Sequence, residues 1–215
     1  MAQSIFDRFH DIGILPVLEI DSAERARPVA EALLAGGLPV IEVTMRTESA
    51  RDSIRVIAKE VRDVIVGAGT VLNREQAKAA RDAGAQFFVS PGMVEEVVIW
   101  ALENQIPVLP GAVTPTEMIR GISLGLSILK FFPAEAAGGL SAIRAMSDPF
   151  PQLRFIPTGG IRPENAGRYL QNEKIHAVGG SWMAKRQMIA EGRFAEITRM
   201  ANEASNLAKQ IREHS

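Results

Sequence analysis

Eight short apolar runs recur along the chain, and a longer amphipathic stretch follows each of them. The runs span residues 14–20, 40–46, 64–71, 86–92, 106–113, 127–134, 154–160 and 176–181. Strands that alternate with helices pair in parallel, and near-continuous apolar strands are buried on both faces. Eight such units in 215 residues predict a closed (β/α)8 barrel, also called a TIM barrel. An open doubly wound sheet is the alternative, although no GxGxxG motif opens a helix after a strand.

The barrel is predicted to take up the whole chain as a single domain, 1–215, because no linker separates the units. Residues 1–13 predict an extra N-terminal helix before the first strand, and residues 184–213 predict a helical C-terminal segment. Cap residues mark several helix ends, with N-caps expected at Ser22, Asn73 and Thr114 and glycine stops at Gly36, Gly84 and Gly121.

Composition excludes several classes of partner and cofactor. The net charge is −1, so no overall field favours nucleic acid or an anionic membrane. The absence of cysteine excludes disulfides, cysteine nucleophiles and thiolate metal sites. No stretch approaches the ~20 apolar residues of a membrane span, and the first residues do not form a signal peptide. We therefore expect a soluble cytoplasmic protein.

One lysine lies inside an apolar run. Lys130 stands between Leu129 and Phe131 in SILKFFPAE (127–135), whereas the other five lysines lie in polar, helix-like or loop settings. Burial of an ammonium without a partner costs several kcal/mol, roughly, and favours the neutral amine. A neutral lysine is a nucleophile for carbonyl compounds, so Lys130 is the candidate for a Schiff base. The alternative is a lysine that extends between the helices to reach water.

Polar side chains also alternate along the second run, VIEVTMR (40–46). Glu42, Thr44 and Arg46 share one face, and in a barrel that face points to the interior. If Lys130 also points inward, Glu42 offers it a base and Arg46 disfavours a second positive charge. A Glu42–Arg46 pair that only fills space is the alternative.

The last two strands end in paired glycines, PTGGI (157–161) and VGGSW (178–182). Glycine allows a ligand to approach the backbone, and free N–H groups at a helix start bind anions. The loops after strands seven and eight are the usual phosphate site of such barrels. Ser181 adds a hydroxyl donor, so a phosphate-bearing ligand is expected here.

Together these motifs resemble the family of 2-keto-3-deoxy-6-phosphogluconate (KDPG) aldolase and 4-hydroxy-2-oxoglutarate (KHG) aldolase. The resemblance extends over nearly the whole chain, in EVTMRTE (42–48), VGAGTVLN (66–73), SPG (90–92), PGAVTPTE (110–117), LKFFPAE (129–135), PTGGI (157–161) and VGGSW (178–182). It implies a class I aldolase that cleaves KDPG to pyruvate and glyceraldehyde 3-phosphate, and KHG to pyruvate and glyoxylate. It further implies a homotrimer whose covalent imine needs no metal or other cofactor.

The resemblance also implies a role for each matching residue. These are Lys130 as the Schiff-base lysine, Glu42 as the general acid/base, Arg46 and Thr70 as ligands of the keto-acid carboxylate, Pro91, Phe132 and Thr158 as the pocket lining, and Gly159, Gly160, Gly180 and Ser181 as the phosphate site. Glu19 departs from the family, whose members commonly have an apolar or small residue there. We expect Glu19 to be non-catalytic, although an inward-facing Glu19 would be a second carboxylate near the site.

Other functions remain as alternatives. The galactonate-derived C4 epimer is a close substrate alternative, although Thr158 and Ser181 favour the gluconate type by resemblance. A phosphosugar epimerase or isomerase would share the phosphate site but would not need a buried lysine. A non-catalytic phospho-ligand sensor leaves the grouped polar residues unexplained. A zinc-dependent aldolase needs clustered ligands, whereas His10, His176 and His214 are scattered in the sequence.

Overall fold

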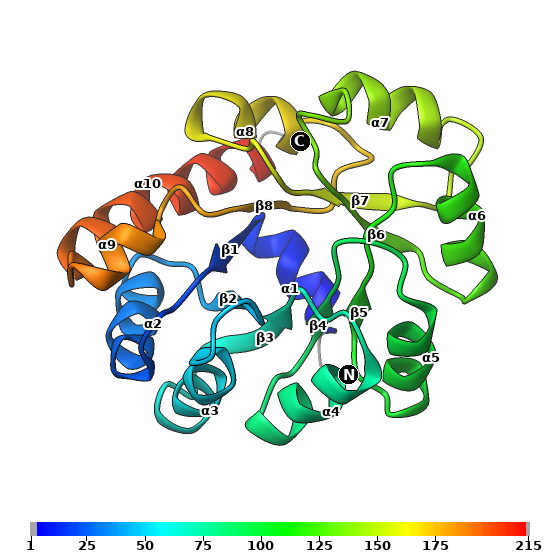
Figure 1. The fold of residues 1–215 in the computed structure, drawn as a ribbon. Helices are drawn as coiled ribbons and strands as arrows, with labels where there is room; N and C mark the ends of the chain where they lie inside the picture. The colour runs from blue at the N-terminus through cyan, green and yellow to red at the C-terminus, as the bar shows by residue number, and fades with distance from the viewer. Residues whose placement is uncertain (1–3, 214–215) are drawn as a thin grey trace.

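The computed structural model describes residues 4–213, in which a ring of strands is surrounded by helices (Figure 1). Each strand lies within one of the eight apolar runs but is shorter than the run. The strands are β1 Ile14–Leu18, β2 Val40–Thr44, β3 Ile65–Gly69, β4 Phe88–Val89, β5 Val108–Leu109, β6 Ile128–Phe131, β7 Arg154–Pro157 and β8 Val178–Gly180. The residues that follow each strand form loops at the end of the ring that faces the viewer in Figure 1.

All strand pairs are parallel, and together they close the barrel. Six strands follow the order β5-β4-β3-β2-β1-β8, and β6 pairs with β7. Isolated bridges between Gly111 and Lys130 and between Thr158 and Gly179 join the two groups. At the first junction the N–H of Lys130 donates to the carbonyl of Pro110 at 2.9 Å. The predicted (β/α)8 barrel is therefore confirmed, and the open doubly wound sheet is wrong.

The helices lie outside the ring, apart from the first. They are α1 Ile5–Ile12, the 3-10 turn η1 Ala23–Arg25, α2 Ala26–Ala35, α3 Ala50–Glu60, α4 Arg74–Ala83, α5 Glu95–Glu103, α6 Pro115–Ser123, α7 Gly139–Ser147, α8 Pro163–Leu170, α9 Arg186–Ala190 and α10 Phe194–Arg212. Part of the helix predicted at 1–13 falls on residues 1–3, outside the described residues. The segment predicted at 184–213 is two helices with a turn at Gly192, whose φ is 70°.

Two of the three predicted N-caps form side-chain hydrogen bonds. The side chain of Asn73 accepts from the N–H of Gln76 at 2.8 Å, and Thr114 forms a reciprocal capping box with Glu117. Ser22 precedes η1, but its side chain makes no capping bond. Ser22 has the extended backbone that is typical of an N-cap, so neither the residue type nor this conformation is sufficient for the capping bond.

Two of the three predicted glycine stops are helix C-caps. Gly36 ends α2 and Gly84 ends α4, the latter in the left-handed conformation with φ 101°. Gly121 was predicted as a stop, but α6 continues through it to Ser123, so this prediction is wrong. A Cβ on Gly121 would lie 3.0 Å from Leu129, so the glycine allows α6 to approach β6 closely.

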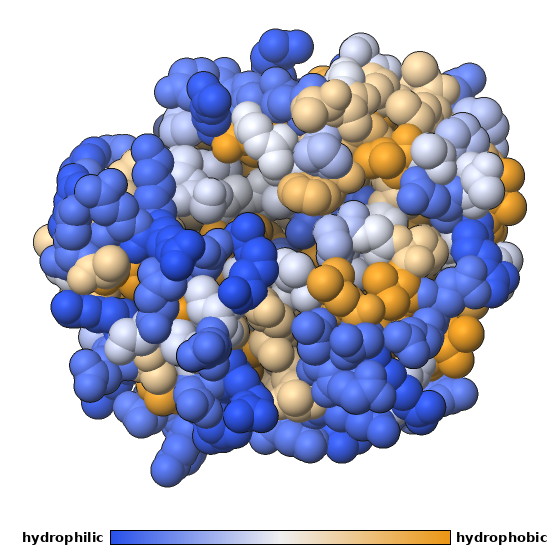
Figure 2. Space-filling view, viewed as in Figure 1, coloured by the Kyte–Doolittle hydropathy of each residue, from blue (hydrophilic) through white to orange (hydrophobic). Residues whose placement is uncertain are grey.

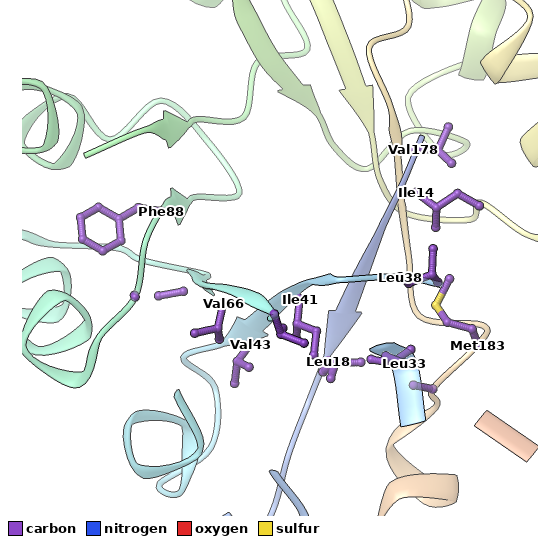
Figure 3. Packing of buried hydrophobic residues seen from close by; sticks show 14 of the residues in the cluster. Ile14, Leu18, Leu33, Leu38, Ile41, Val43, Val66, Phe88, Val178 and Met183 are labelled. Carbon is purple, nitrogen blue, oxygen red and sulfur yellow. The ribbon is translucent and has the colours of Figure 1, made fainter. Parts of the chain in front are cut away.

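The barrel is packed on two sides. Outside the ring, apolar strand residues meet the helices, and Figure 3 shows Leu18 of β1 and Leu33 of α2 pointing toward each other. At the other end from the loops, Phe9 of α1 contacts Phe87 edge-to-face with 4.9 Å between ring centroids. Helix α1 therefore covers the amino ends of the strands, and it crosses the middle of the ring in Figure 1. No helix among residues 4–213 has the length and apolar character that a bilayer crossing requires.

Candidate active site

A buried lysine and a buried glutamate meet inside the barrel. Lys130 belongs to β6 and Glu42 to β2, and the Nζ of the lysine lies 3.5 Å from Oε1 of the glutamate. Their side chains are only 7% and 1% exposed. Because β2 and β6 are not neighbours in the ring, this contact crosses the interior. The predicted inward orientation of both residues is confirmed, and the alternative of a lysine that extends between helices is wrong.

Glycine makes room for the Glu42 carboxylate. A Cβ on Gly69, at the end of β3, would lie 2.1 Å from Oε1 of Glu42. Oε2 of the same carboxylate is buried and accepts no hydrogen bond within residues 4–213. Buried carboxylate oxygens normally have a partner, so this oxygen is suited to accept a proton or a hydrogen bond from a ligand.

Aromatic and apolar groups surround Lys130. Its Nζ lies 5.2 Å from the centre of the Phe132 ring, which is a cation–π geometry when the amine is charged. The neighbouring side chains of Leu129 and Phe131 point to the opposite face and are wholly buried in the layer between strands and helices. The alternation along β6 therefore places the amine in the interior while its neighbours hold the strand.

A cavity of about 250 Å³ opens at the carboxyl ends of the strands. Its lining includes seven of the predicted site residues: Arg46, Phe132, Thr158, Gly159, Gly160, Gly180 and Ser181. Figure 2 shows this face with pale, weakly polar residues near its middle and hydrophilic residues around much of the rim. Gly159 and Gly160 have φ of 98° and 81°, and L side chains rarely adopt these values.

Arg46 reaches the cavity from a loop. Strand β2 ends at Thr44, so Arg46 lies two residues beyond the strand in which it was predicted. Its Nε donates to Oγ1 of Thr44 at 3.3 Å, and its Nη2 lies 2.9 Å from Oε2 of Glu19. The alternative of a space-filling Glu42–Arg46 pair is wrong, because each of the two has a different ionic partner.

Glu19 lies just past β1 and connects two arginines at the mouth of the cavity. Besides Arg46, it forms an ion pair with Arg186, which in turn binds Asp21 through two bonds of 2.8 and 2.7 Å. Glu19 faces the site, yet it is paired with arginines and not with Lys130. Sequence reasoning missed Arg186 and Asp21. The only signal for Arg186 is its place at the start of the helix after the second glycine pair.

The remaining predicted residues lie on neighbouring loops and do not line this cavity. Thr70 directly follows β3, where its φ of 55° is unusual for a residue with a side chain. Pro91 follows β4, and a Cβ on Gly111 would lie 2.1 Å from its carbonyl oxygen. The predicted site is therefore divided between the cavity, at the ends of β1, β2, β6, β7 and β8, and the loops that follow β3 and β4.

Residues 4–213 contain no group of three histidine, aspartate or glutamate side chains placed to hold a metal. His10 of α1 lies next to His176, with 5.3 Å between ring centroids, at the other end of the barrel from the cavity. His214 lies outside the described residues.

Comparison with known proteins identifies the family. The family model for KDPG and KHG aldolase matches residues 5–200. The chain belongs to the KDPG and KHG aldolase family. It is 48% identical to the KHG/KDPG aldolase of Escherichia coli K12, over 91% of this chain and 92% of the relative.

Two solved aldolase structures share this fold. The KDPG aldolase of Zymomonas mobilis superposes with a TM-score of 0.87 at 44% identity, covering 93% of this chain and 96% of the other. The enzyme of Legionella pneumophila, solved with pyruvate captured at low pH as a covalent carbinolamine intermediate, gives a TM-score of 0.90 at 37% identity. That alignment covers 94% of this chain and 98% of the Legionella chain.

Proposed function

We propose that this protein is a class I aldolase that cleaves KDPG to pyruvate and glyceraldehyde 3-phosphate through a Schiff base on Lys130. The observation that carries the proposal is the buried Lys130–Glu42 pair inside the barrel, near a cavity with two glycine-rich loops. The pair supplies a nucleophilic amine and an adjacent base, which is the arrangement that imine chemistry needs. KHG, which would give pyruvate and glyoxylate, is proposed as a second substrate.

The comparisons support this proposal. The Escherichia coli relative is a KHG/KDPG aldolase, and the Legionella structure holds pyruvate as a covalent carbinolamine. A carbinolamine is the adduct that an amine forms with a ketone before water is lost. The same chemistry requires a nucleophilic amine in this chain, and Lys130 is the buried lysine among the described residues.

The proposed reaction starts when neutral Lys130 attacks the C2 ketone of KDPG. Glu42, 3.5 Å from the amine, is the proposed acceptor for the proton that the amine loses. Glu42 returns this proton to the hydroxyl of the carbinolamine, which leaves as water and gives a protonated imine, an electron sink. Glu42 then takes the proton of the C4 hydroxyl, the C3–C4 bond breaks, and its electrons form the enamine of pyruvate while glyceraldehyde 3-phosphate leaves. A proton is returned to C3, and hydrolysis frees pyruvate and the amine.

The other residues are proposed to hold the substrate. Arg46 and Thr70 would bind the C1 carboxylate, with Arg46 suited to paired N–H contacts. Pro91, Phe132 and Thr158 would line the pocket. The backbone at Gly159, Gly160 and Gly180 and the hydroxyl of Ser181 would bind the phosphate, and these four residues all line the cavity. Glu19 is proposed to orient Arg46 without taking part in proton transfer.

Borohydride reduction in the presence of pyruvate tests the mechanism directly. We expect a pyruvate-derived mass on the peptide that contains Lys130. An active protein without that adduct would overturn the imine mechanism and favour a phosphosugar epimerase or isomerase. If the adduct forms, comparison of kcat/KM for KDPG and for its galactonate-derived C4 epimer decides the substrate. We propose that KDPG is the preferred one.

We also propose a cytoplasmic homotrimer that acts without a metal ion. The resemblance to the aldolase family supports the trimer, and Leu72 and Ile119, 48% and 56% exposed, are large apolar side chains on the surface of this chain. Light scattering should give three times the mass of one chain, and a monomer that retains full activity would contradict the trimer. Prolonged dialysis against a chelator should leave the activity unchanged, and a loss that added metal restores would contradict metal-free chemistry.

A further inference from the structure

We propose that Arg186 is a phosphate-binding residue that sets the preference for phosphorylated over unphosphorylated keto acids. This inference rests on the aldolase function proposed above and adds a residue to it. Arg186 is the first residue of α9. It lines the same cavity as the two glycine-rich loops, and it approaches them from the side of β1.

Position is the first argument for this role. Gly160, Gly180 and Ser181 line the cavity together with Arg186, so the arginine borders the region proposed to hold phosphate. Backbone N–H groups and a serine hydroxyl bind a phosphate without providing a full positive charge. A guanidinium provides that charge and matches phosphate oxygens with paired N–H groups.

Donor geometry is the second argument. A guanidinium has five N–H donors. In Arg186, Nε and Nη2 donate to the two oxygens of Asp21 at 2.8 and 2.7 Å, and Nη1 donates to Glu19. One N–H on each terminal nitrogen therefore has no hydrogen bond within residues 4–213. The side chain is 57% exposed, so these two donors can bind a phosphate while Asp21 holds the opposite edge.

Charge is the third argument. Glu19 bridges Arg46 on one oxygen and Arg186 on the other, so a carboxylate separates the two cations. The proposed substrate also carries two anionic ends, a C1 carboxylate and a terminal phosphate. Arg46 is the proposed partner of the carboxylate, which leaves Arg186 for the other end. Glu19 and Asp21 offset the repulsion between two arginines at one cavity.

The competing explanation is that Arg186 only attaches α9 to the loop after β1. A purely structural role predicts that its removal affects all substrates alike, because Glu19 and Arg46 would shift together. A phosphate contact predicts an effect that follows the phosphate. The shorter KHG ends before the phosphate site, so it is the natural reference substrate.

The test is Arg186→Met, assayed with KDPG and KHG. We expect the ratio of kcat/KM for KDPG to kcat/KM for KHG to fall about tenfold, mainly through the KM for KDPG. Asp21→Asn, which loosens the arginine without removing it, should lower the ratio by a smaller factor. Arg55→Met is the matched control, because Arg55 is also half-exposed and paired with an aspartate but does not line the cavity.

A ratio of kcat/KM for KDPG to kcat/KM for KHG that stays unchanged in Arg186→Met, whether or not both activities fall, would overturn the phosphate role. Calorimetric titration with inorganic phosphate separates this outcome from failure of the aldolase proposal. Binding should weaken about tenfold in Arg186→Met and stay unchanged in Arg55→Met, whether or not the protein cleaves KDPG. Pyruvate trapping on wild-type Lys130 tests the aldolase chemistry alone, because pyruvate has no phosphate.

Discussion

The Nζ of Lys130 lies 3.5 Å from Oε1 of Glu42, across the interior of the barrel from β6 to β2. Burial of two charged groups rarely adds stability, and apolar residues of similar volume often stabilise a core more. A pair that is almost wholly buried therefore calls for a reason other than stability. Oε2 of Glu42 accepts no hydrogen bond within the described chain, which leaves a proton acceptor beside the amine. The pair is suited to transfer protons during imine chemistry.

Removal of the amine should abolish the reaction. We expect Lys130→Met to lose KDPG cleavage to the background rate and to form no borohydride-trapped pyruvate adduct. Lys130→Arg keeps a positive charge opposite Glu42 but should also be inactive, because a guanidinium stays protonated and does not attack a ketone. Circular dichroism should establish that both variants are folded. Substantial turnover by either folded variant would refute the imine mechanism.

Replacement of the base should slow proton transfer while the nucleophile stays in place. Glu42→Gln keeps the shape of the side chain, and we expect kcat to fall about 10²–10⁴-fold, the usual contribution of a positioned acid or base. Hydrogen exchange at C3 of pyruvate, followed by NMR in heavy water, should slow as well. The trapped pyruvate adduct on Lys130 should still form, at a lower rate. A kcat close to wild type would assign the proton transfers to another group.

A methyl group added at Gly69 should displace the Glu42 carboxylate while every functional group of the site stays present. In Gly69→Ala the new Cβ would lie 2.1 Å from Oε1 of Glu42, so the carboxylate must leave the position that it holds beside Lys130. We expect a fall in kcat of about tenfold or more, with the protein folded. Gly167→Ala in α8 is the control, because its Cβ would lie 3.5 Å from Ile211, an ordinary contact. Equal activity of both variants would show that the position of the carboxylate is unimportant.

The interior of the barrel could be predicted from sequence because strand alternation decides it. Once eight strands are arranged in a ring, the side-chain period of two places Glu42 and Lys130 on the inside. This orientation does not depend on the conformation of the loops. The paired glycines were equally informative. At Gly159 and Gly160 the backbone adopts positive φ, which few residues other than glycine tolerate.

The loops were harder to predict, because their shape depends on contacts between segments far apart in the sequence. The partner of Arg46 is Glu19, from a different strand end, and the partner of Arg186 is Asp21, 165 residues away along the chain. No local pattern encodes such pairs. The prediction that Gly121 ends a helix was wrong for a related reason. A glycine that ends a helix and a glycine that lets a helix approach a strand look alike in sequence.

The end of the barrel opposite the site should make stability depend on pH. Burial lowers the pKa of His176 below its usual value of 6.5, and its Nε2 lies 2.7 Å from the carbonyl oxygen of Phe6. Between the two pKa values the unfolded chain binds more protons than the folded chain. The free energy of unfolding should therefore fall as the pH drops below about 6.5.

His176→Gln tests this prediction, because glutamine has a polar side chain that does not titrate. Denaturant unfolding of the wild type and the variant should be compared from pH 8 to pH 5. Above the pKa that His176 has in the unfolded chain, this side chain is neutral in both the folded and the unfolded state. The free energies of unfolding of the wild type and the variant should therefore differ there by a constant amount. Below it, the wild type should lose stability more steeply than the variant, because only the wild type has this protonation to accommodate. Parallel curves over the whole range would show that His176 stays neutral, or charged, equally in both states.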